Sequence, residues 1–296
     1  MNAFAGETFE VAEAYPGAEP IVPAVRSGPN PVRTPLRRRR RLGLGEPLAF
    51  GPLLGPALLL FYWSVFSATG LLDPRILPAP WTTLQSAWTL TADGRLPANL
   101  AISAVRAAEG LFFGVIAGVV VALISGLSRL GGYVFDGPVQ MKRAVPTLAL
   151  IPLVILWVGI GEPMKVTIIA ISVFIPIYLQ THTALRNTDL KHLELAETLR
   201  LSRWRFIRHV VLPGALPGFM LGLRFGVIGA WGALVVVEQL NATSGIGYMI
   251  NLAGTYAQTD VIVVGLVLYA LLGLTSDAAV RLAEARLFAW RRTLSQ

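Results

Sequence analysis

Few residues of this 296-residue sequence have the types and spacing that catalysis requires. There is no cysteine, which excludes thiolate metal sites, disulfides and a cysteine nucleophile. The three histidines, His182, His192 and His209, lack the spacing of metal ligands, so no metal site is expected. No Gly-x-x-x-x-Gly-Lys-Ser/Thr loop occurs, and no apolar segment carries paired carboxylates or a His-x-x-x-His motif. The sequence therefore predicts neither an enzyme nor a chain that holds ATP in a phosphate-binding loop.

The residues that remain as candidates for chemistry are polar groups inside or beside long apolar segments, where such groups are costly and usually functional. Glu238 ends one apolar segment, and Thr243-Ser-Gly-Ile-Gly-Tyr248 follows it. Gly245 and Gly247 permit a re-entrant turn in which backbone lines a cavity. Glu238 either forms part of a gate or caps backbone N–H groups of this loop, and one residue can do both. The candidate gate or pathway residues here are Glu238, Ser244, Gly245, Gly247 and Tyr248.

Three more charged side chains lie in apolar segments. Arg106 and Glu109 are one helical turn apart, which favours an internal ion pair at the outer interface over contact with a substrate. Arg224, or the N-terminus of a lining helix, is a candidate for easing the passage of an anion. The aromatic residues near these positions are expected in the interfacial belt or the core. They are Trp157, Trp231 and Tyr248.

The elements that must position these residues are membrane-spanning helices. The chain is 54% hydrophobic and 14% charged, with a mean hydropathy of +0.61, whereas a soluble chain carries about 25% charged residues. Segments of about 20 apolar residues can cross a bilayer as helices. We therefore predict an all-α polytopic membrane protein with six transmembrane helices. They cover residues 48–69, 101–127, 139–158, 164–183, 212–237 and 261–282. Pro146 and Pro152 interrupt the third, which should face protein or the pathway.

The basic residues predict the orientation. The net charge of +8 could indicate a nucleic-acid partner or a membrane surface. If the N-terminus is cytoplasmic, the cytoplasmic segments hold twenty of the 25 Lys and Arg residues, with Arg129, Lys142 and Arg143 around the second turn. This asymmetry follows the positive-inside rule. We expect both termini in the cytoplasm, a lipid bilayer as partner and no nucleic acid.

The segments outside the helices predict the domain limits. Residues 1–47 are expected to be a disordered cytoplasmic tail whose five consecutive arginines at 37–41 lie beside anionic lipid. Residues 48–98 then form the first transmembrane helix and an extracytoplasmic loop, and residues 289–296 a cytoplasmic tail.

Glycines recur every fourth residue in two of the predicted helices. One set lies in the second helix and the other in the fifth. They are Gly110, Gly114 and Gly118, and Gly214, Gly218, Gly222 and Gly226. This spacing places each set on one helix face, where another helix can approach closely. Packing within one protomer is favoured, and a homodimer seam is the alternative.

The loop at residues 187–213 carries the most informative pattern. Asp189 can cap a first short helix, and Ser202 can cap a second that runs to Val211. Leu, Trp and Phe stand among the charges of this loop, which is unusual for a solvated connector. Two short helices with such a surface are suited to dock into a groove on a soluble partner.

Here the sequence resembles a known family. The run Glu194-Leu-Ala-Glu-Thr-Leu-Arg200, followed by Val210 and Leu212-Pro213 at the family's spacing, resembles the EAA loop of ATP-binding-cassette (ABC) importer permeases. The resemblance implies that this coupling loop seats in the ATPase subunit. Leu195 replaces an alanine of the pattern, and Arg200 replaces a glycine, so Arg200 must avoid positive φ or accept strain. The positions that inherit the loop's role are Glu194, Leu195, Ala196, Arg200, Leu212 and Pro213.

The similarity extends over about residues 99–290 and is greatest to permeases of the aliphatic sulfonate, taurine and nitrate type. The matching segments are 148–161, 174–178, 212–218, 238–248, 258–261 and 268–273. The resemblance implies a type I ABC importer permease fold, with a permease domain at 99–288. It also implies a homodimer in the bacterial inner membrane, two copies of a cytoplasmic ATPase that carries the ATP and Mg, and an extracytoplasmic substrate-binding protein.

The resemblance leaves the substrate open. We expect a small anion, foremost an aliphatic sulfonate, with taurine, nitrate or bicarbonate, or a vitamin precursor as alternatives. A carrier or channel that needs no ATPase is the hypothesis from another class. It would transport along a gradient alone and would show inverted repeats around a broken helix, which the sequence lacks.

Overall fold

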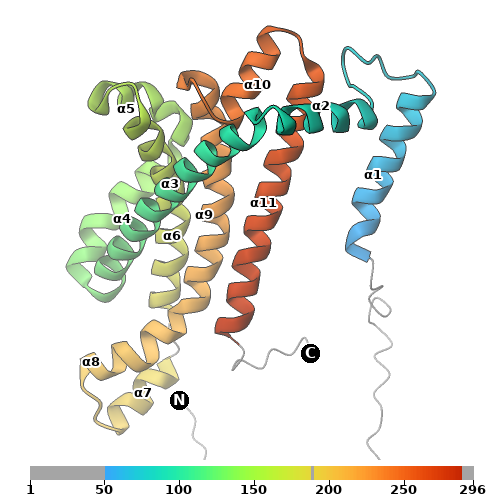
Figure 1. Cartoon of the computed structure of the whole chain (residues 1–296). Coiled ribbons are helices and arrows are strands. Elements are labelled where there is room, and N and C mark those ends of the chain that lie inside the picture. Colours follow the sequence, from blue (N-terminus) through green and yellow to red (C-terminus); the bar gives the residue numbers. More distant parts are fainter. Residues whose placement is uncertain (1–50, 188–189, 289–296) are drawn as a thin grey trace, which may run out of the picture. The chain divides into compact units, whose positions relative to one another are not determined.

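The computed structural model describes residues 51–187 and 190–288. Within these ranges the regular elements are all helices (Figure 1), which confirms the all-α prediction. The predicted tails at 1–47 and 289–296 and the cap at Asp189 lie outside the described residues. The helices are α1 Gly51–Ala68, α2 Pro80–Ala92, α3 Arg95–Leu127, α4 Arg129–Ala144, the 3₁₀ turn η1 Thr147–Leu150, α5 Ile151–Val158, α6 Glu162–Arg186, α7 Leu190–Thr198, α8 Arg203–Phe206, the π-helical turn η2 Ile207–Val211, α9 Leu212–Asn241, α10 Ile246–Thr255 and α11 Thr259–Leu287.

Four helices of the described chain are long and apolar enough to cross a membrane. They are α3, α6, the continuous helix Arg203–Asn241 that joins α8, η2 and α9, and α11. The bent pair formed by α4 with η1 and α5 raises the number to five if it is one span. The apolar part of α1, Leu54–Ala68, is shorter than a typical span. The number of six transmembrane helices therefore stays a prediction.

The third predicted helix differs from the expectation. The chain bends by 98° between Ala144 and Thr147, because Pro146 cannot continue the hydrogen-bond pattern of α4. The helix also begins earlier, where the hydroxyl of Ser128 accepts a hydrogen bond from the N–H of Gly131 at 2.9 Å. Since α4 has 16 residues, it is about 24 Å long.

This length corrects the placement of three basic residues. Arg129 opens α4, whereas Lys142 and Arg143 lie in its last turn. These three residues therefore lie at the two ends of one helix and not around a single turn, while their side of the membrane stays a prediction.

The fifth predicted helix also differs at its start. Ser202 caps α8 as expected, since its hydroxyl accepts from the N–H of Arg205 at 3.4 Å. The helix does not end at Val211 but continues through the π-helical turn η2 into α9. Pro213 follows that turn directly; it has no N–H and its ring crowds the preceding turn, and a widened π-helical turn accommodates this.

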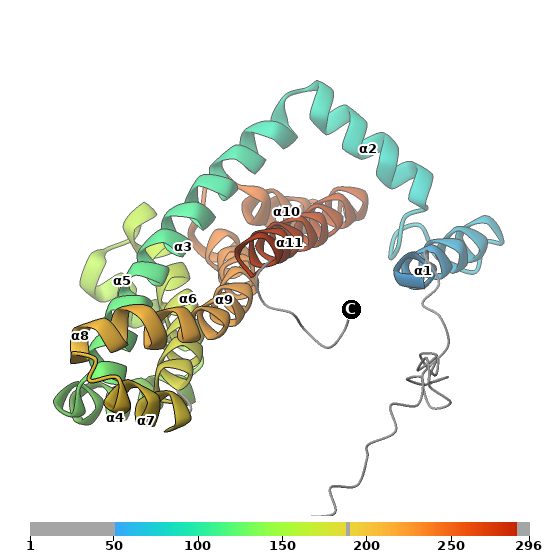
Figure 2. The same cartoon turned by 90° about the horizontal axis from the view of Figure 1, so that it is seen from below.

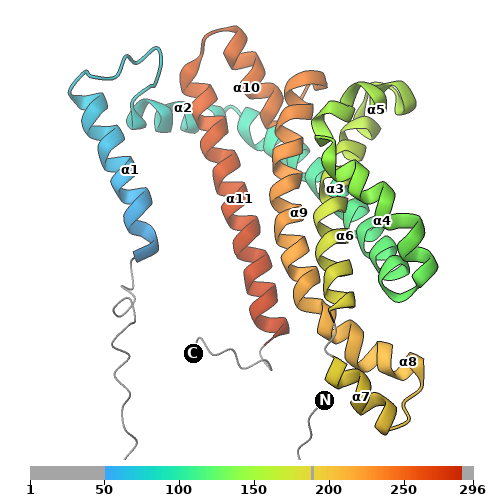
Figure 3. The same cartoon turned by 180° about the vertical axis from the view of Figure 1, so that it is seen from behind.

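The core is organised around α6, which lies between α3 and α9 (Figures 2 and 3). Both glycine stripes face it. A Cβ added at Gly114 would lie 2.6 Å from the carbonyl oxygen of Ala170, and one at Gly222 would lie 2.9 Å from that of Pro176. Gly110, Gly118, Gly218 and Gly226 likewise face α6 side chains or backbone, whereas Gly214 faces open space. Packing within the protomer is thus confirmed for six of these seven glycines.

A matched pair of glycine variants tests this packing. Gly114→Ala should destabilise the protein by about 1–3 kcal/mol, because the new methyl group meets backbone that cannot move aside. Gly273→Ala is the control on α11, where nothing lies within 4 Å of the added Cβ, and it should be neutral or stabilise by up to about 1 kcal/mol. Thermal unfolding in detergent measures both. Equal midpoints for the two variants would contradict the close approach of α3 to α6.

Candidate functional site

Glu238 is the centre of a buried polar cluster. Its carboxylate is fully buried on α9. It accepts hydrogen bonds from the hydroxyl of Ser103 at 2.8 Å, from the Arg106 guanidinium at 2.8 Å and from the hydroxyl of Tyr269 at 3.1 Å. It also accepts from the backbone N–H of Gly247 at 2.8 Å. These donors replace the water that the carboxylate loses on burial. Glu238 therefore joins α3, α9, α10 and α11 at one point.

The same cluster caps the N-terminus of α10. Three successive N–H groups there are bound by side chains: Gly245 by Asn99 at 2.7 Å, Ile246 by Ser103 at 2.9 Å and Gly247 by Glu238. These groups have no partner within their own helix, and a carboxylate also suits the positive end of the helix dipole. The geometry thus shows the capping interaction that was predicted for Glu238. The role of Glu238 in a gate stays a prediction.

Gly245 is required at this turn. Its φ is +112°, a value that favours glycine. A Cβ at this position would also clash with both carboxylate oxygens of Glu238. The turn after α9 and the buried carboxylate therefore depend on each other.

Arg106 binds two carboxylates from other helices. Its Nε and Nη2 atoms donate to both oxygens of Glu162 at 2.6 Å each, and its Nη1 donates to Glu238 and to the carbonyl oxygen of Ser244. Lys165 donates to Glu162 at 2.8 Å. Two cations thus face two carboxylates, so the charges of the cluster balance.

The predicted pair of Arg106 with Glu109 was wrong. Arg106 lies on the buried face of α3, where α6 and α9 supply carboxylates, while Glu109 is exposed. Partners that are distant in the sequence cannot be found from spacing along one helix.

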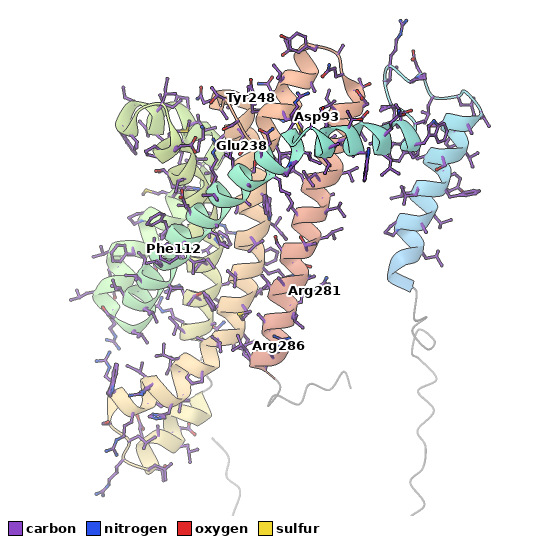
Figure 4. All side chains as sticks on the ribbon, viewed as in Figure 1. Asp93, Phe112, Glu238, Tyr248, Arg281 and Arg286 are labelled. Carbon is purple, nitrogen blue, oxygen red and sulfur yellow. The ribbon has the colours of Figure 1, made fainter. Side chains whose placement is uncertain are left out.

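The cluster opens on one side through Glu162, whose side chain is 56% exposed. A hollow of about 590 Å³ lies between α3 and α6, and it is lined by Glu109, Glu162 and apolar side chains that include Phe113 and Phe174. Figure 4 shows Glu238 near the α10 end of the helices and Arg281 and Arg286 toward the other end of α11. The cluster therefore belongs to the end of the bundle away from α7 and α8.

Arg224 does not join this cluster. Its Nε donates to Asp277 of α11 at 2.6 Å, and Arg281 binds the other oxygen of Asp277 at 3.3 Å. Two arginines thus share one carboxylate, and a role of Arg224 in anion passage stays a prediction. Tyr248 is half-buried on α10, Trp231 packs edge-on against Tyr269 in the core, and Trp157 is exposed.

A second polar cluster was missed from the sequence. Asp136 of α4 accepts hydrogen bonds from the hydroxyls of Tyr178 at 2.5 Å and Ser125 at 2.6 Å. His182 and Arg186 of α6 lie 3.5 Å from its oxygens. Only the fold brings α3, α4 and α6 together here, although an aspartate in an apolar region is itself a signal. In the described part of the chain, no group of three or more acidic or histidine side chains could hold a metal ion.

The segment between α6 and α9, where a coupling loop is predicted, ends its first helix α7 at a strained residue. Arg200 has a φ of +50°, and the N–H of Leu201 donates to the carbonyl of Ala196 at 2.9 Å. This is a left-handed helix end, a position that glycine usually occupies. Arg200 thus adopts a left-handed conformation and accepts the strain.

The loop presents apolar side chains to its surroundings. Leu195, Leu199 and Trp204 are 56%, 61% and 66% exposed, whereas Ala196 is buried. Arg203 donates to the carbonyl oxygen of Leu127 at 3.0 Å, which fixes α8 to the end of α3. Glu194 is exposed, and Leu212 and Pro213 start α9 with their side chains exposed.

The comparisons with known proteins decide the family. The family model of the binding-protein-dependent transport system inner membrane component matches residues 110–289. The chain belongs to this family. It is 44% identical over 243 residues to the protein named aliphatic sulfonates transport permease protein SsuC of Escherichia coli (strain K12), covering 82% of this chain and 92% of that protein. It is 32% identical to the taurine transport system permease protein TauC of the same organism, with 87% and 92% covered.

The fold is shared with a solved transporter. A crystal structure of an amino acid ABC transporter with histidines matches with a TM-score of 0.58 and 17% identity, covering 67% of this chain and 96% of that chain. Family membership confirms the predicted type I ABC importer permease fold and the transport function. The permease is a multi-pass inner-membrane subunit and not an enzyme. It works with an ATPase, which hydrolyses the ATP, and with a substrate-binding protein.

Removing one residue of the buried cluster tests how much the cluster contributes to the stability of the protein. Glu238→Ala leaves Arg106 with one carboxylate and the Gly247 N–H without an acceptor, so we expect a loss of about 3–5 kcal/mol of unfolding free energy. Glu109→Ala is the matched control, because it removes an exposed glutamate of α3, and it should change stability by less than about 0.5 kcal/mol. Thermal unfolding in detergent reports both, and similar midpoints would contradict the cluster.

Removing the strain at Arg200 should increase stability, whereas removing Glu238 should decrease it. Arg200→Gly should stabilise the end of α7 by about 1 kcal/mol, or about fivefold slower exchange of its amide hydrogens, because left-handed backbone costs a side-chain-bearing residue about 1–2 kcal/mol. Arg205→Gly is the control within a helix and should speed exchange nearby. Hydrogen exchange by mass spectrometry distinguishes them. Faster exchange after Arg200→Gly would refute the strained helix end.

Proposed function

We propose that this permease forms the translocation pathway for an aliphatic sulfonate, imported at the expense of ATP. The observation that carries the proposal is the 44% identity to the E. coli SsuC protein over 92% of its length. A second relative of that name, from Bacillus subtilis (strain 168), is 37% identical over 87% of its length. The taurine permease TauC is less similar. Taurine, nitrate or bicarbonate, and a vitamin precursor therefore rank behind an aliphatic sulfonate.

The assembly that we propose has two copies of this chain, two copies of the ATPase and one substrate-binding protein. ATP and Mg belong to the ATPase, and this chain carries no cofactor of its own. Both termini face the cytoplasm, with the coupling loop at residues 187–213, so α2 and α10 lie at the extracytoplasmic end. The permease domain spans 99–288, after a tail at 1–47 and a first transmembrane helix and loop at 48–98. The tail at 289–296 ends the chain, and no nucleic acid takes part.

The coupling loop is the proposed contact with the ATPase. Leu195, Leu199 and Trp204 supply exposed apolar surface, which soluble chains rarely leave uncovered. Four arginines in and around α8 add positive charge that suits an acidic groove. They are Arg200, Arg203, Arg205 and Arg208.

One continuous helix connects this loop to the buried cluster. Residues Arg203–Asn241 form 39 residues of helix, about 60 Å in length. The loop occupies one end and Glu238 the other. A displacement of α8 by the ATPase would therefore reach Glu238, which holds the turn before α10 and, through Arg106, Glu162 of α6. We propose that this junction changes its contacts when the pathway opens and closes.

Transport in reconstituted vesicles tests the function. The chain, its ATPase and its binding protein are incorporated in liposomes, and uptake of labelled ethanesulfonate is compared with that of taurine, nitrate and bicarbonate. We expect ATP-dependent uptake with ethanesulfonate preferred. Uptake along a gradient without the ATPase would instead favour the carrier or channel, and preference for another anion would refute the proposed substrate.

Variants of the loop test the coupling. Leu195→Asp combined with Trp204→Asp should reduce copurification of the ATPase and ATP-dependent uptake at least tenfold, because charges replace the apolar contact. Leu71→Asp is the control, since Leu71 is 71% exposed but lies in the loop between α1 and α2. Undiminished copurification of the double variant would refute docking through these side chains.

A further inference from the structure

Helix α2 has a place and composition unlike those of the other helices. Figures 1 and 3 show that it runs across the direction of α9 and α11, at the end of the bundle where α10 lies. Its sequence, Pro-Trp-Thr-Thr-Leu-Gln-Ser-Ala-Trp-Thr-Leu-Thr-Ala, contains no charged residue. Gly94, with a φ of +74°, makes the sharp turn that leads from α2 into α3. Helix α2 is thus placed across the ends of the spans and does not extend them.

One face of α2 is fixed against the bundle. Thr83 and Leu90 are buried, and the hydroxyl of Ser86 donates to Asp260 at the start of α11 at 2.5 Å. Just before α2, the carbonyl oxygen of Pro78 accepts a hydrogen bond from the indole N–H of Trp63 of α1 at 3.1 Å. The rotation of α2 about its own axis is therefore set by these contacts.

The remaining surface divides into an apolar and a polar strip. Trp81, Leu84 and Trp88 are 56%, 72% and 76% exposed, and at about 100° per residue they fall within one arc of about 60°. They line an open hollow on the surface of α2 together with Gln85, Ala87 and Thr91. The exposed residues of the polar strip form a second arc of about 60°, centred about 100° from the first. They are Thr82, Gln85 and Thr89.

The arrangement of the apolar and polar strips indicates which medium surrounds α2. Hydrocarbon on all sides would leave the Gln85 amide without water, and water on all sides would leave two indoles and a leucine in solvent. A helix that lies in the membrane interface meets both media at once, and tryptophan is enriched there. Charged residues flank α2 on both sides and are exposed, as at an interface with headgroups and water. They are Asp73, Arg75, Asp93 and Arg95.

We propose that α2 is an interfacial helix that binds the lipid surface at the end of the bundle away from the coupling loop. Trp81, Leu84 and Trp88 enter the boundary between headgroups and acyl chains, and the strip around Gln85 faces water. The contact with Asp260 would then hold the outer end of α11 at a fixed depth in the bilayer. This inference does not depend on the transported substrate.

Site-directed spin labelling tests the proposal directly, since the chain has no native cysteine. Full-length single variants Leu84→Cys, Trp88→Cys, Thr82→Cys and Thr89→Cys are labelled with a nitroxide and reconstituted in phosphatidylglycerol and phosphatidylcholine vesicles. Thr83→Cys is the control for a position covered by protein. Collision rates with oxygen, which dissolves in lipid, and with a water-soluble nickel chelate are measured by electron paramagnetic resonance.

We expect labels at 84 and 88 to collide several-fold more often with oxygen than with the nickel chelate, at a depth of about 5–10 Å below the phosphates. Labels at 82 and 89 should show the reverse, and the label at 83 should collide little with either. Nickel access at 84 equal to that at 82 would place α2 in water and overturn the proposal. Low access to both reagents at 84 and 88 would place a protein surface there, from a second copy or another partner, and would also overturn it. Because Leu84→Cys leaves both indoles in place, the result does not depend on Trp88→Cys folding.

Discussion

The buried guanidinium of Arg106 is the interaction on which the arrangement of the helices depends. A cation inside a membrane protein is stable only if carboxylates and hydrogen-bond acceptors replace its water. Glu162, Glu238 and the backbone of Ser244 do this, and each comes from a different element. The requirement therefore fixes α3 relative to α6, α9 and the turn before α10. Glu238 extends the same requirement to α11 through the hydroxyl of Tyr269.

Such a cluster can form only where the helices approach closely, and the two glycine stripes make this possible. Gly110 and Gly114 bring α3 onto α6 close to Arg106, and Gly222 and Gly226 bring α9 onto an adjoining face of the same helix. In lipid, association between helices rests on packing and polar contacts, because the surrounding chains are as apolar as leucine. Glycine packing and the ion cluster therefore support each other: packing sets the distance between the helices, and the charges set their register.

Periodicity and local chemistry predicted much of this fold, and the failures share one cause. The long apolar helices, the Ser202 cap and the packing of both glycine stripes depend on residues that are close in the sequence. The partner wrongly predicted for Arg106 was Glu109, which is close to it in the sequence. The carboxylates that Arg106 binds lie 56 and 132 positions away from it. Asp136 was missed for the same reason, since its partners come from α3 and α6. Pro146 was seen as an interruption, but only the fold shows that the chain bends by 98° there.

Arg200 links the local structure of the loop to the arrangement of the helices. The end of α7 is left-handed although an arginine and not a glycine occupies it, so the fold tolerates the strain at this bend. The bend separates α7 from α8, and α8 continues without interruption into the helix that carries Glu238. A helix without a break transmits rotation and translation along its whole length, whereas a flexible hinge at Val211 would absorb them. The π-helical turn before Pro213 preserves this continuity at the place where a proline would otherwise end the helix. The sequence of the loop thus sets both the surface available to a partner and the stiffness with which a movement there reaches the buried carboxylate.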